Sequence, residues 1–214
     1  MIVEKIMSKE VITLSPTDTL FDANKIMQKQ KIRHLPIVDA SNKLVGLVAQ
    51  RDIKNTISSF LNETQEDAIY QTPIADIMIK DPMIGHPLDF IEEVALLFYE
   101  HKIGCLPIVS QHKLVGIITD TDLLYSYIEL TGATQPSSRI DIRVKDEAGT
   151  LRDITNIIAE HNANILSTLI YQDDQPDLQI LSIRLKSMNP LPIIQSLRKG
   201  GFDVLWPNIP GMKM

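Results

Sequence analysis

Two aspartates follow the same hydrophobic pattern at two places in the chain. Residues 32–52 read IRHLPIVDASNKLVGLVAQRD, and residues 103–122 read IGCLPIVSQHKLVGIITDTD. The second copy ends with Thr119 and Asp122, whereas the first keeps the aspartate, Asp52, without the threonine. A carboxylate can accept both vicinal hydroxyls of a ribose, and a threonine hydroxyl or the N–H groups at a helix start can meet a phosphate. The spacing T-x-x-D therefore predicts nucleotide chemistry at the second copy.

Both aspartates also have a purely structural interpretation. An amphipathic run follows each of them, so the pattern predicts that Asp52 and Asp122 begin a helix as its N-cap. A capping aspartate stabilises a helix by roughly 1 kcal/mol whether or not a ligand exists. Helix capping and ligand binding therefore remain alternatives at both positions.

The first copy replaces the threonine by cationic side chains nearby. Arg51 precedes Asp52, and Arg33 and His34 lie where the second copy has glycine and cysteine. Arginine forms paired hydrogen bonds with phosphate oxygens. We expect that the two sites have diverged, and that the first has either lost affinity or relies on cationic contacts to extra phosphates.

An internal repeat must position these residues. Ile32 maps to Ile103 at an offset of 71 residues, and one residue fewer in the following turn brings Asp52 onto Asp122. Apolar residues at helical spacing follow Pro16 and its counterpart, and two short strands and a second helix come next. Each repeat is predicted to be strand, helix, strand, strand, helix. Because about 60 residues bury little surface alone, we expect the two repeats to pair their sheets about a pseudo-twofold axis to complete a core.

A different pattern begins after the stretch TGATQPSS at 131–138, whose glycine and proline predict a linker. The order there is strand, helix, two strands around the turn DDQPD, helix and strand. This βαββαβ order is typical of a ferredoxin-like sandwich with both helices on one face of an antiparallel sheet. The sequence thus predicts an α+β chain with repeats at 1–62 and 72–130, a linker at 131–138 and a third domain at 139–214.

Two known families resemble these patterns. The doubled I-x-x-LPIV, KLVG and terminal aspartate are similar to the CBS-domain family, whose members occur as tandem pairs of βαββα-type repeats. The runs DEAGTL at 146–151 and NANI at 162–165 resemble an ACT domain, a regulatory module that senses small ligands, although Ala148 replaces the proline usual in its loop. A CBS pair followed by an ACT domain resembles the AcuB family of acetoin-utilisation proteins.

The resemblance implies roles for particular residues. It assigns an adenosyl ligand in the second repeat to Thr119, Asp122 and the backbone of Ile84, and a weaker site in the first repeat to Thr13, Arg33, His34, Arg51 and Asp52. In the ACT-like segment an amino acid would be held by Asp146, Gly149 and Asn164, unless these residues form only a turn and a helix stop. The candidate regulatory ligands are AMP, ADP, ATP, NAD and S-adenosylmethionine, and no catalytic cofactor is expected.

Composition restricts the classes of partner. A net charge of −6 disfavours nucleic acid and anionic membrane surfaces, because an acidic protein repels polyanions. The sequence has no run of about 18 apolar residues, the length needed to span a membrane, and its start lacks the pattern of a secretory leader. We therefore expect a cytoplasmic protein. The single cysteine, Cys105, lies in an apolar run and is expected to be buried, and the five histidines lack metal-ligand spacing.

The resulting hypothesis is a non-catalytic, homodimeric sensor. It binds an adenosyl ligand at the CBS pair, has an ACT domain that dimerises and can take an amino acid, and regulates an unidentified partner protein, by resemblance in acetoin catabolism. One alternative is a ligand-free assembly protein. Another is an enzyme that processes a nucleotide with Asp120 or Asp122 and a histidine, for which the sequence shows neither a metal set nor a preorganised acid and base.

Overall fold

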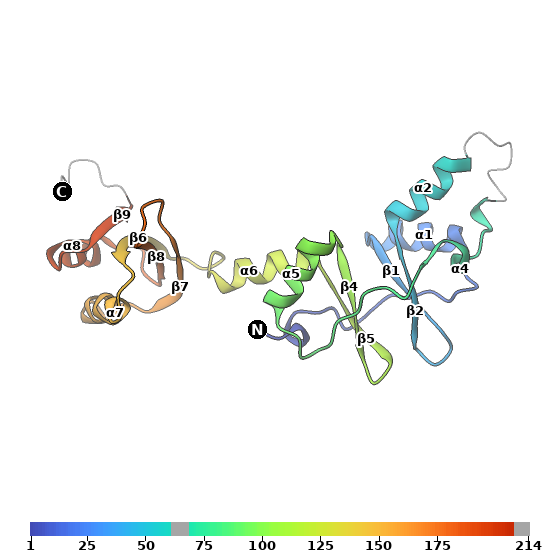
Figure 1. Cartoon of the computed structure of the whole chain (residues 1–214), viewed down its shortest axis with the longest axis horizontal. Helices are drawn as coiled ribbons and strands as arrows, with labels where there is room; N and C mark the ends of the chain where they lie inside the picture. The colour runs from blue at the N-terminus through green and yellow to red at the C-terminus, as the bar shows by residue number, and fades with distance from the viewer. Residues whose placement is uncertain (61–68, 208–214) are drawn as a thin grey trace. The chain divides into compact units, whose positions relative to one another are not determined.

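A computed structural model of the chain describes residues 1–60 and 69–207. The chain forms two compact units, Met1–Leu124 and Tyr125–Met214 (Figure 1). The first unit contains both copies of the repeat up to the first residues of the last helix, Asp120–Leu130, and the mixture of helices and strands confirms the α+β class. The finer boundaries 1–62, 72–130, 131–138 and 139–214 stay predictions, and residues 61–62 and 208–214 of them lie outside the described part.

Both repeats contain the predicted helix, hairpin and second helix (Figure 1). The elements of the first repeat are η1 (Val3–Lys5), α1 (Leu20–Gln30), β1 (His34–Val38), β2 (Leu44–Ala49) and α2 (Gln50–Phe60). Those of the second are α4 (Ile74–Ile77), β3 (Ile79–Lys80), α5 (Ile91–His101), β4 (Cys105–Ser110), β5 (Lys113–Thr119) and α6 (Asp120–Leu130). Helices α1 and α5 both end at a lysine in the left-handed conformation, Lys31 and Lys102, each with φ 55°.

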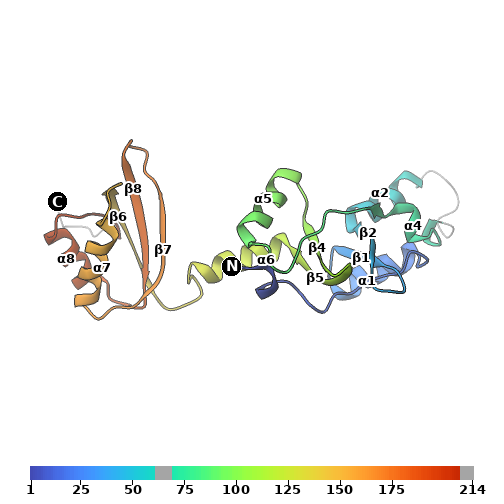
Figure 2. The same ribbon diagram turned by 60° about the horizontal axis from the view of Figure 1, so that its bottom comes forward.

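The second unit has the predicted βαββαβ order. Its elements are β6 (Ser138–Lys145), α7 (Thr150–Glu160), β7 (Ile165–Gln172), β8 (Leu178–Leu185), α8 (Leu191–Lys199) and β9 (Asp203–Trp206). The antiparallel sheet has the order β7-β8-β6-β9, and α7 and α8 cover one of its faces (Figure 2). Ile142 and Leu181 are paired across β6 and β8 and are buried with Ile158 and Leu197 of the helices. The alternation of apolar residues along β6 thus faces a single core.

The predicted leading strand of each repeat is reduced to a single bridge. Leu14 bridges Ile37 in parallel, and Gly85 bridges Ile108 in the same way. An aspartate ends the pairing, because Asp18 Oδ2 accepts the Ser15 N–H at 2.7 Å and Asp89 Oδ2 accepts the His86 N–H at 2.6 Å. These N–H groups are therefore withdrawn from a longer ladder.

The two repeats exchange the segments that precede their leading bridges. Ser8 of the first repeat bridges Ile117 in β5, and β3 of the second repeat pairs with β2. Val3 consequently belongs to the core cluster of the second repeat, and Ile74 to that of the first. The repeats complete two core clusters in a reciprocal way, which differs from the expected joint core between their sheets.

Each exchanged segment is held by a methionine against a glycine of the other repeat. A Cβ atom at Gly116 would lie 2.5 Å from Met7 Sδ and 3.1 Å from the Ser8 carbonyl oxygen. A Cβ atom at Gly46 would overlap Met78 Sδ in the same manner and lie 3.2 Å from the carbonyl oxygen of Ile79. Both glycines are therefore required for close approach of two chain segments.

Adding a methyl group at either glycine is expected to loosen the exchange. Gly46→Ala should lower the free energy of unfolding by about 1–3 kcal/mol, because the methyl group overpacks a filled contact. Urea unfolding followed by circular dichroism measures the loss. In a Met78→Ala background the same change should cost less, since the competing sulfur is gone, and fully additive effects would contradict this explanation.

Candidate functional site

Among the clefts formed by described residues of the Met1–Leu124 unit, two lie at the starts of α2 and α6, and we name each after one of its residues. The Thr119 cleft has a volume of about 320 Å³ and the Arg51 cleft one of about 900 Å³. The Thr119 cleft is lined by Ser8, Glu10, Val11, Ile12, Lys31, Ile32, Arg33, His34, Pro36, Ile117, Thr119, Thr121 and Asp122. The Arg51 cleft is lined by Arg33, His34, Leu47, Ala49, Gln50, Arg51, Lys54, Asn55, Ile79, Asp81, Pro82, Met83, Lys102, Ile103, Gly104, Cys105 and Asp120.

Each cleft combines parts of both repeats because of the exchanged segments. The Thr119 cleft joins the start of α6 in the second repeat to residues 8–12 and 31–34 of the first. The Arg51 cleft joins the start of α2 in the first repeat to residues 79–83 and 102–105 of the second. The two clefts are thus related by the internal repeat, and neither is complete within one repeat.

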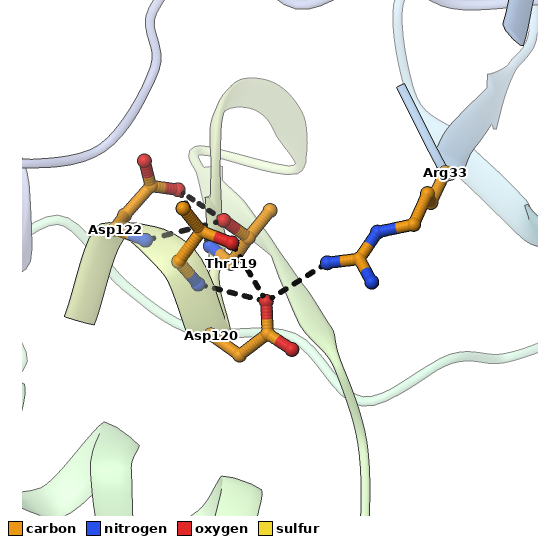
Figure 3. A network of polar contacts seen from close by, with 5 residues as sticks. Arg33, Thr119, Asp120 and Asp122 are labelled. Atoms are coloured by element: carbon orange, nitrogen blue, oxygen red, sulfur yellow. Dashed lines mark hydrogen bonds and ion pairs between the residues drawn. The ribbon is translucent and has the colours of Figure 1, made fainter. Parts of the chain in front are cut away.

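Thr119 and Asp122 form a reciprocal hydrogen-bond pair at the start of α6 (Figure 3). Asp122 Oδ2 accepts the Thr119 N–H at 2.8 Å and the Thr119 hydroxyl at 2.6 Å, and the Asp122 N–H donates to Thr119 Oγ1 at 3.3 Å. Helix α6 begins at Asp120, so the prediction that Asp122 is the N-cap is wrong: Asp122 lies in the first turn and Thr119 precedes the helix. The hydroxyl proton of Thr119 is used within the protein.

The same bonds occur elsewhere in the chain, outside both the Thr119 cleft and the Arg51 cleft. Thr19 and Asp22 form a capping box at α1 with distances of 3.1, 2.6 and 3.3 Å for the same three contacts. The hydrogen bonds at α6 are therefore those of an ordinary helix start. What distinguishes Asp122 is its place in a cleft, where its second carboxylate oxygen points away from Thr119 (Figure 3).

Asp52 has the equivalent place in α2 with fewer contacts. Helix α2 begins at Gln50, so Asp52 also lies in the first turn and the prediction that it is the N-cap is wrong. Its Oδ2 accepts the Ala49 N–H at 2.9 Å, and alanine has no hydroxyl to add. The carboxylate of the first repeat is thus held by one bond where that of the second is held by two.

An ion pair joins the two repeats between the clefts. Arg33 Nη2 lies 3.3 Å from Asp120 Oδ1, which also accepts the Thr121 N–H at 2.7 Å (Figure 3). Both charged side chains are more than half exposed, at 59% and 54%, so the pair adds little to stability. The ion pair instead holds the position of Arg33, which together with His34 lines both clefts.

Comparison with known proteins agrees with this architecture. The family model of the CBS domain matches residues 3–59 and 74–129, and that of the ACT domain matches residues 138–199. The chain belongs to the CBS-domain family. It is a tandem CBS pair followed by an ACT domain, as the sequence predicted.

The solved structures that are similar to the CBS pair include the following three. A Vibrio cholerae protein named for acetoin utilization (AcuB) is 39% identical, with a TM-score of 0.56, over 63% of this chain and 95% of that one. The CBS pair of protein MJ0100, in complex with 5′-methylthioadenosine and S-adenosyl-L-methionine, is 29% identical with a TM-score of 0.52 over 63% and 98%. CBSX2 of Arabidopsis thaliana, in complex with AMP, is 25% identical with a TM-score of 0.52 over 59% and 96%.

The curated relatives are mostly longer proteins. The first three are 34%, 37% and 29% identical to this chain, which spans 23%, 22% and 50% of their lengths. The likeness therefore concerns the CBS pair as a module, and the activities of those whole proteins do not transfer with it.

The CBS pair brings together part of the predicted site. Thr119, Asp122, Arg33 and His34 line the Thr119 cleft, whereas Arg33, His34 and Arg51 line the other. Three predicted residues, Thr13, Ile84 and Asp52, are outside both sets of lining residues. Instead, Val11 and Ile12 line the Thr119 cleft, and the equivalent Pro82 and Met83 line the Arg51 cleft. The ligand roles of all these residues stay predictions.

Three lysines at the clefts were not predicted from the sequence. Lys31 lines the Thr119 cleft, whereas Lys54 and Lys102 line the Arg51 cleft. Lys31 and Lys102 are equivalent across the repeat at the offset of 71 residues, and both end a helix in the left-handed conformation. The repeat offset was therefore a signal for these two, because it placed a lysine next to each strand start.

The predicted amino-acid residues of the ACT domain lie at two ends of one helix. Gly149, with φ 100°, precedes α7, and Asp146 lies in the same loop. Asn164 follows the other end of α7, where its carbonyl oxygen accepts the Lys186 N–H at 2.8 Å. An 11-residue helix is about 16 Å long, so one copy of the domain does not bring Asp146 and Asn164 together.

Metal and thiol chemistry find little support in the described residues. Within 1–60 and 69–207, no three His, Cys, Asp or Glu side chains are grouped to hold a metal ion. Over the same part of the chain, no helix has the length and apolar character needed to cross a membrane. Cys105 is buried, 3% exposed, and burial followed by the charge of Asp120 raises the pKa of its thiol to about 12. The thiol stays protonated and packs as a small apolar residue.

His34 has a lowered pKa at the point shared by the clefts. Burial is the main cause, and the positive charge of Arg33 adds to it, while the carboxylates of Asp120 and Asp52 act in the opposite direction. Arg51 lowers the pKa further. The imidazole is therefore neutral at pH 7 in the ligand-free protein and available as a hydrogen-bond partner.

This shift predicts how stability depends on pH. An unfolded histidine, with a pKa near 6.5, binds a proton before folded His34 does, so His34 stabilises the fold above about pH 6.5 and loses that contribution as pH falls toward its lowered value. Urea unfolding between pH 7.5 and 5 should show a smaller acid loss for His34→Gln than for the wild type. Identical pH profiles would contradict the assignment.

Proposed function

We propose that the chain is a regulatory, non-catalytic sensor whose CBS pair binds an adenine nucleotide or another adenosyl ligand. The observation that carries the proposal is the Thr119 cleft, where the Asp122 carboxylate has an oxygen directed away from its capping partner. Arg33 and His34 supply groups for an anionic substituent, and Val11 and Ile12 supply an apolar wall for a base. A ribose diol, a phosphate and a flat base match these three parts.

The solved relatives support the ligand class. MJ0100 was seen with 5′-methylthioadenosine and S-adenosyl-L-methionine, and CBSX2 with AMP. All three ligands share an adenosine moiety and differ in their 5′ substituent. For this chain the proposal is therefore an adenosyl ligand chosen from AMP, ADP, ATP, NAD and S-adenosylmethionine or their close analogues.

Signal output requires that ligand binding favour one arrangement of the protein over another. Because each cleft contains segments of both repeats, a ligand in it contacts both and can bias how they pack. We propose that a homodimer presents this change to a regulated partner protein in the cytoplasm. Similarity to AcuB supports a role in acetoin catabolism, and growth on acetoin of cells lacking the gene tests that role directly.

A second ligand is proposed for the ACT domain. Asp146 and Gly149 stand at the start of α7, and Asn164 beyond its end, so an amino acid held by all three would need two copies of the domain. Sedimentation with and without an amino-acid panel measures whether binding and dimer formation are linked.

Thermal unfolding with a panel of adenosyl ligands tests the sensor proposal. A ligand at about 100 times its dissociation constant should add roughly 2.7 kcal/mol to the native state, a shift of several degrees for a chain of this size. We expect wild-type protein to shift and Asp122→Ala not to shift. Asp22→Ala is the matched control, because it breaks an equivalent capping box outside the clefts and should keep the ligand shift.

The alternatives predict other outcomes of the same experiment. An assembly protein without a ligand gives no shift with any compound, and Asp122 is then a helix-start residue only. An enzyme gives product from ATP at a rate that Asp122→Ala abolishes. Equal loss of the ligand shift in both aspartate variants would show that capping, and not contact with the ligand, explains the effect.

A further inference from the structure

The two clefts differ sharply in their fixed charges. The Arg51 cleft has four arginine or lysine side chains against two carboxylates, namely Arg33, Arg51, Lys54 and Lys102 against Asp81 and Asp120. The Thr119 cleft has two of each, namely Lys31 and Arg33 against Glu10 and Asp122. One cleft is thus net positive and the other balanced, although the whole chain carries a net charge of −6.

The difference arises from substitutions at equivalent positions of the repeat. Arg51 and Lys54 on α2 correspond to Thr121 and Leu124 on α6, at the offset of 70 residues. The cations are therefore specific to the first helix of the pair. A ligand at α2 meets two positive side chains that a ligand at α6 does not meet.

The helix starts differ as well. Helix α6 begins with Asp120, whose carboxylate lines the Arg51 cleft, accepts the Thr121 N–H at 2.7 Å and pairs with Arg33 at 3.3 Å. The equivalent residue of α2 is the neutral Gln50, which also lines the Arg51 cleft, so the positive end of that helix dipole has no acidic side chain at this position.

From these differences we infer that the Arg51 cleft binds the polyphosphate chain of a nucleoside di- or triphosphate, and that the Thr119 cleft takes an adenosyl ligand with a short or uncharged 5′ substituent. The inference rests on the proposed function and divides its ligands between the two clefts. The volumes agree in direction, since the Arg51 cleft, at about 900 Å³, is larger than the Thr119 cleft, at about 320 Å³. Arg51 and Lys54 distinguish this cleft from the other, and Lys102, whose counterpart in the Thr119 cleft is Lys31, adds a further cationic contact.

Lys102 is positioned to turn toward a phosphate. Its Nζ lies 4.5 Å from the centroid of the Tyr99 ring, and Tyr99 is 73% exposed. An exposed cation–π contact is weaker than a charge-assisted hydrogen bond to a phosphate oxygen, so a ligand can draw the lysine away. In the absence of a ligand, the Lys102 ammonium group thus stays against the Tyr99 ring.

Calorimetric titration of the full chain with ATP and with 5′-methylthioadenosine tests the division. The double variant Lys54→Gln/Lys102→Gln should raise the dissociation constant of ATP by about tenfold or more, because each lysine loses a hydrogen bond to a charged group. The dissociation constant of 5′-methylthioadenosine should stay within about twofold. Added salt should weaken ATP binding and leave 5′-methylthioadenosine binding nearly unchanged.

The control is Lys29→Gln, which removes the same charge from the last turn of α1, outside both clefts, and should leave ATP binding as in the wild type. The inference would be overturned if the double lysine variant bound ATP as tightly as the wild type. It would also be overturned if Lys31→Gln weakened ATP binding and the double variant did not. If 5′-methylthioadenosine binds and ATP does not, only the polyphosphate assignment fails. If neither binds, the proposed adenosyl sensor fails and the inference fails with it.

Discussion

The fit of Met7 against Gly116, and of Met78 against Gly46, is the contact on which the CBS pair depends. Each contact seats the leading segment of one repeat against the sheet of the other. Because neither repeat has enough chain to complete a core alone, the exchange supplies residues that each core cluster lacks. The same exchange builds the clefts, since residues 8–12 reach the start of α6 by following β5.

Much of the fold was predictable because its signals are local. The helical spacing of Leu20, Ala23 and Met27, the paired short strands and the βαββαβ order all depend on neighbours within one element. The exchange was not predictable in this way. Because the sequence is doubled, Ser8 could pair with the second hairpin strand of its own repeat or with that of the other repeat. The pattern alone does not choose between these two partners.

The candidate site was predicted in part for the same reason. Arg33, Asp122 and Thr119 were found because their types differ between the copies or match a motif, and the structure places them in one cleft. Residues selected for backbone contacts, such as Thr13 and Ile84, carry no side-chain signal, and their neighbours line the clefts instead. The lysines were missed because a lone lysine on a polar surface is ordinary until the fold brings four cations together.

Hydrogen bonding alone does not separate the candidate site at Asp122 from an ordinary helix start. Thr19 and Asp22 make the contacts that Thr119 and Asp122 make, at nearly the same distances, and line neither the Thr119 cleft nor the Arg51 cleft. A capping box fixes the carboxylate in one orientation, and the surrounding fold decides what its free oxygen meets. A ribose would thus bind a carboxylate that is already held rigid for a structural reason, so little side-chain entropy would be lost on binding.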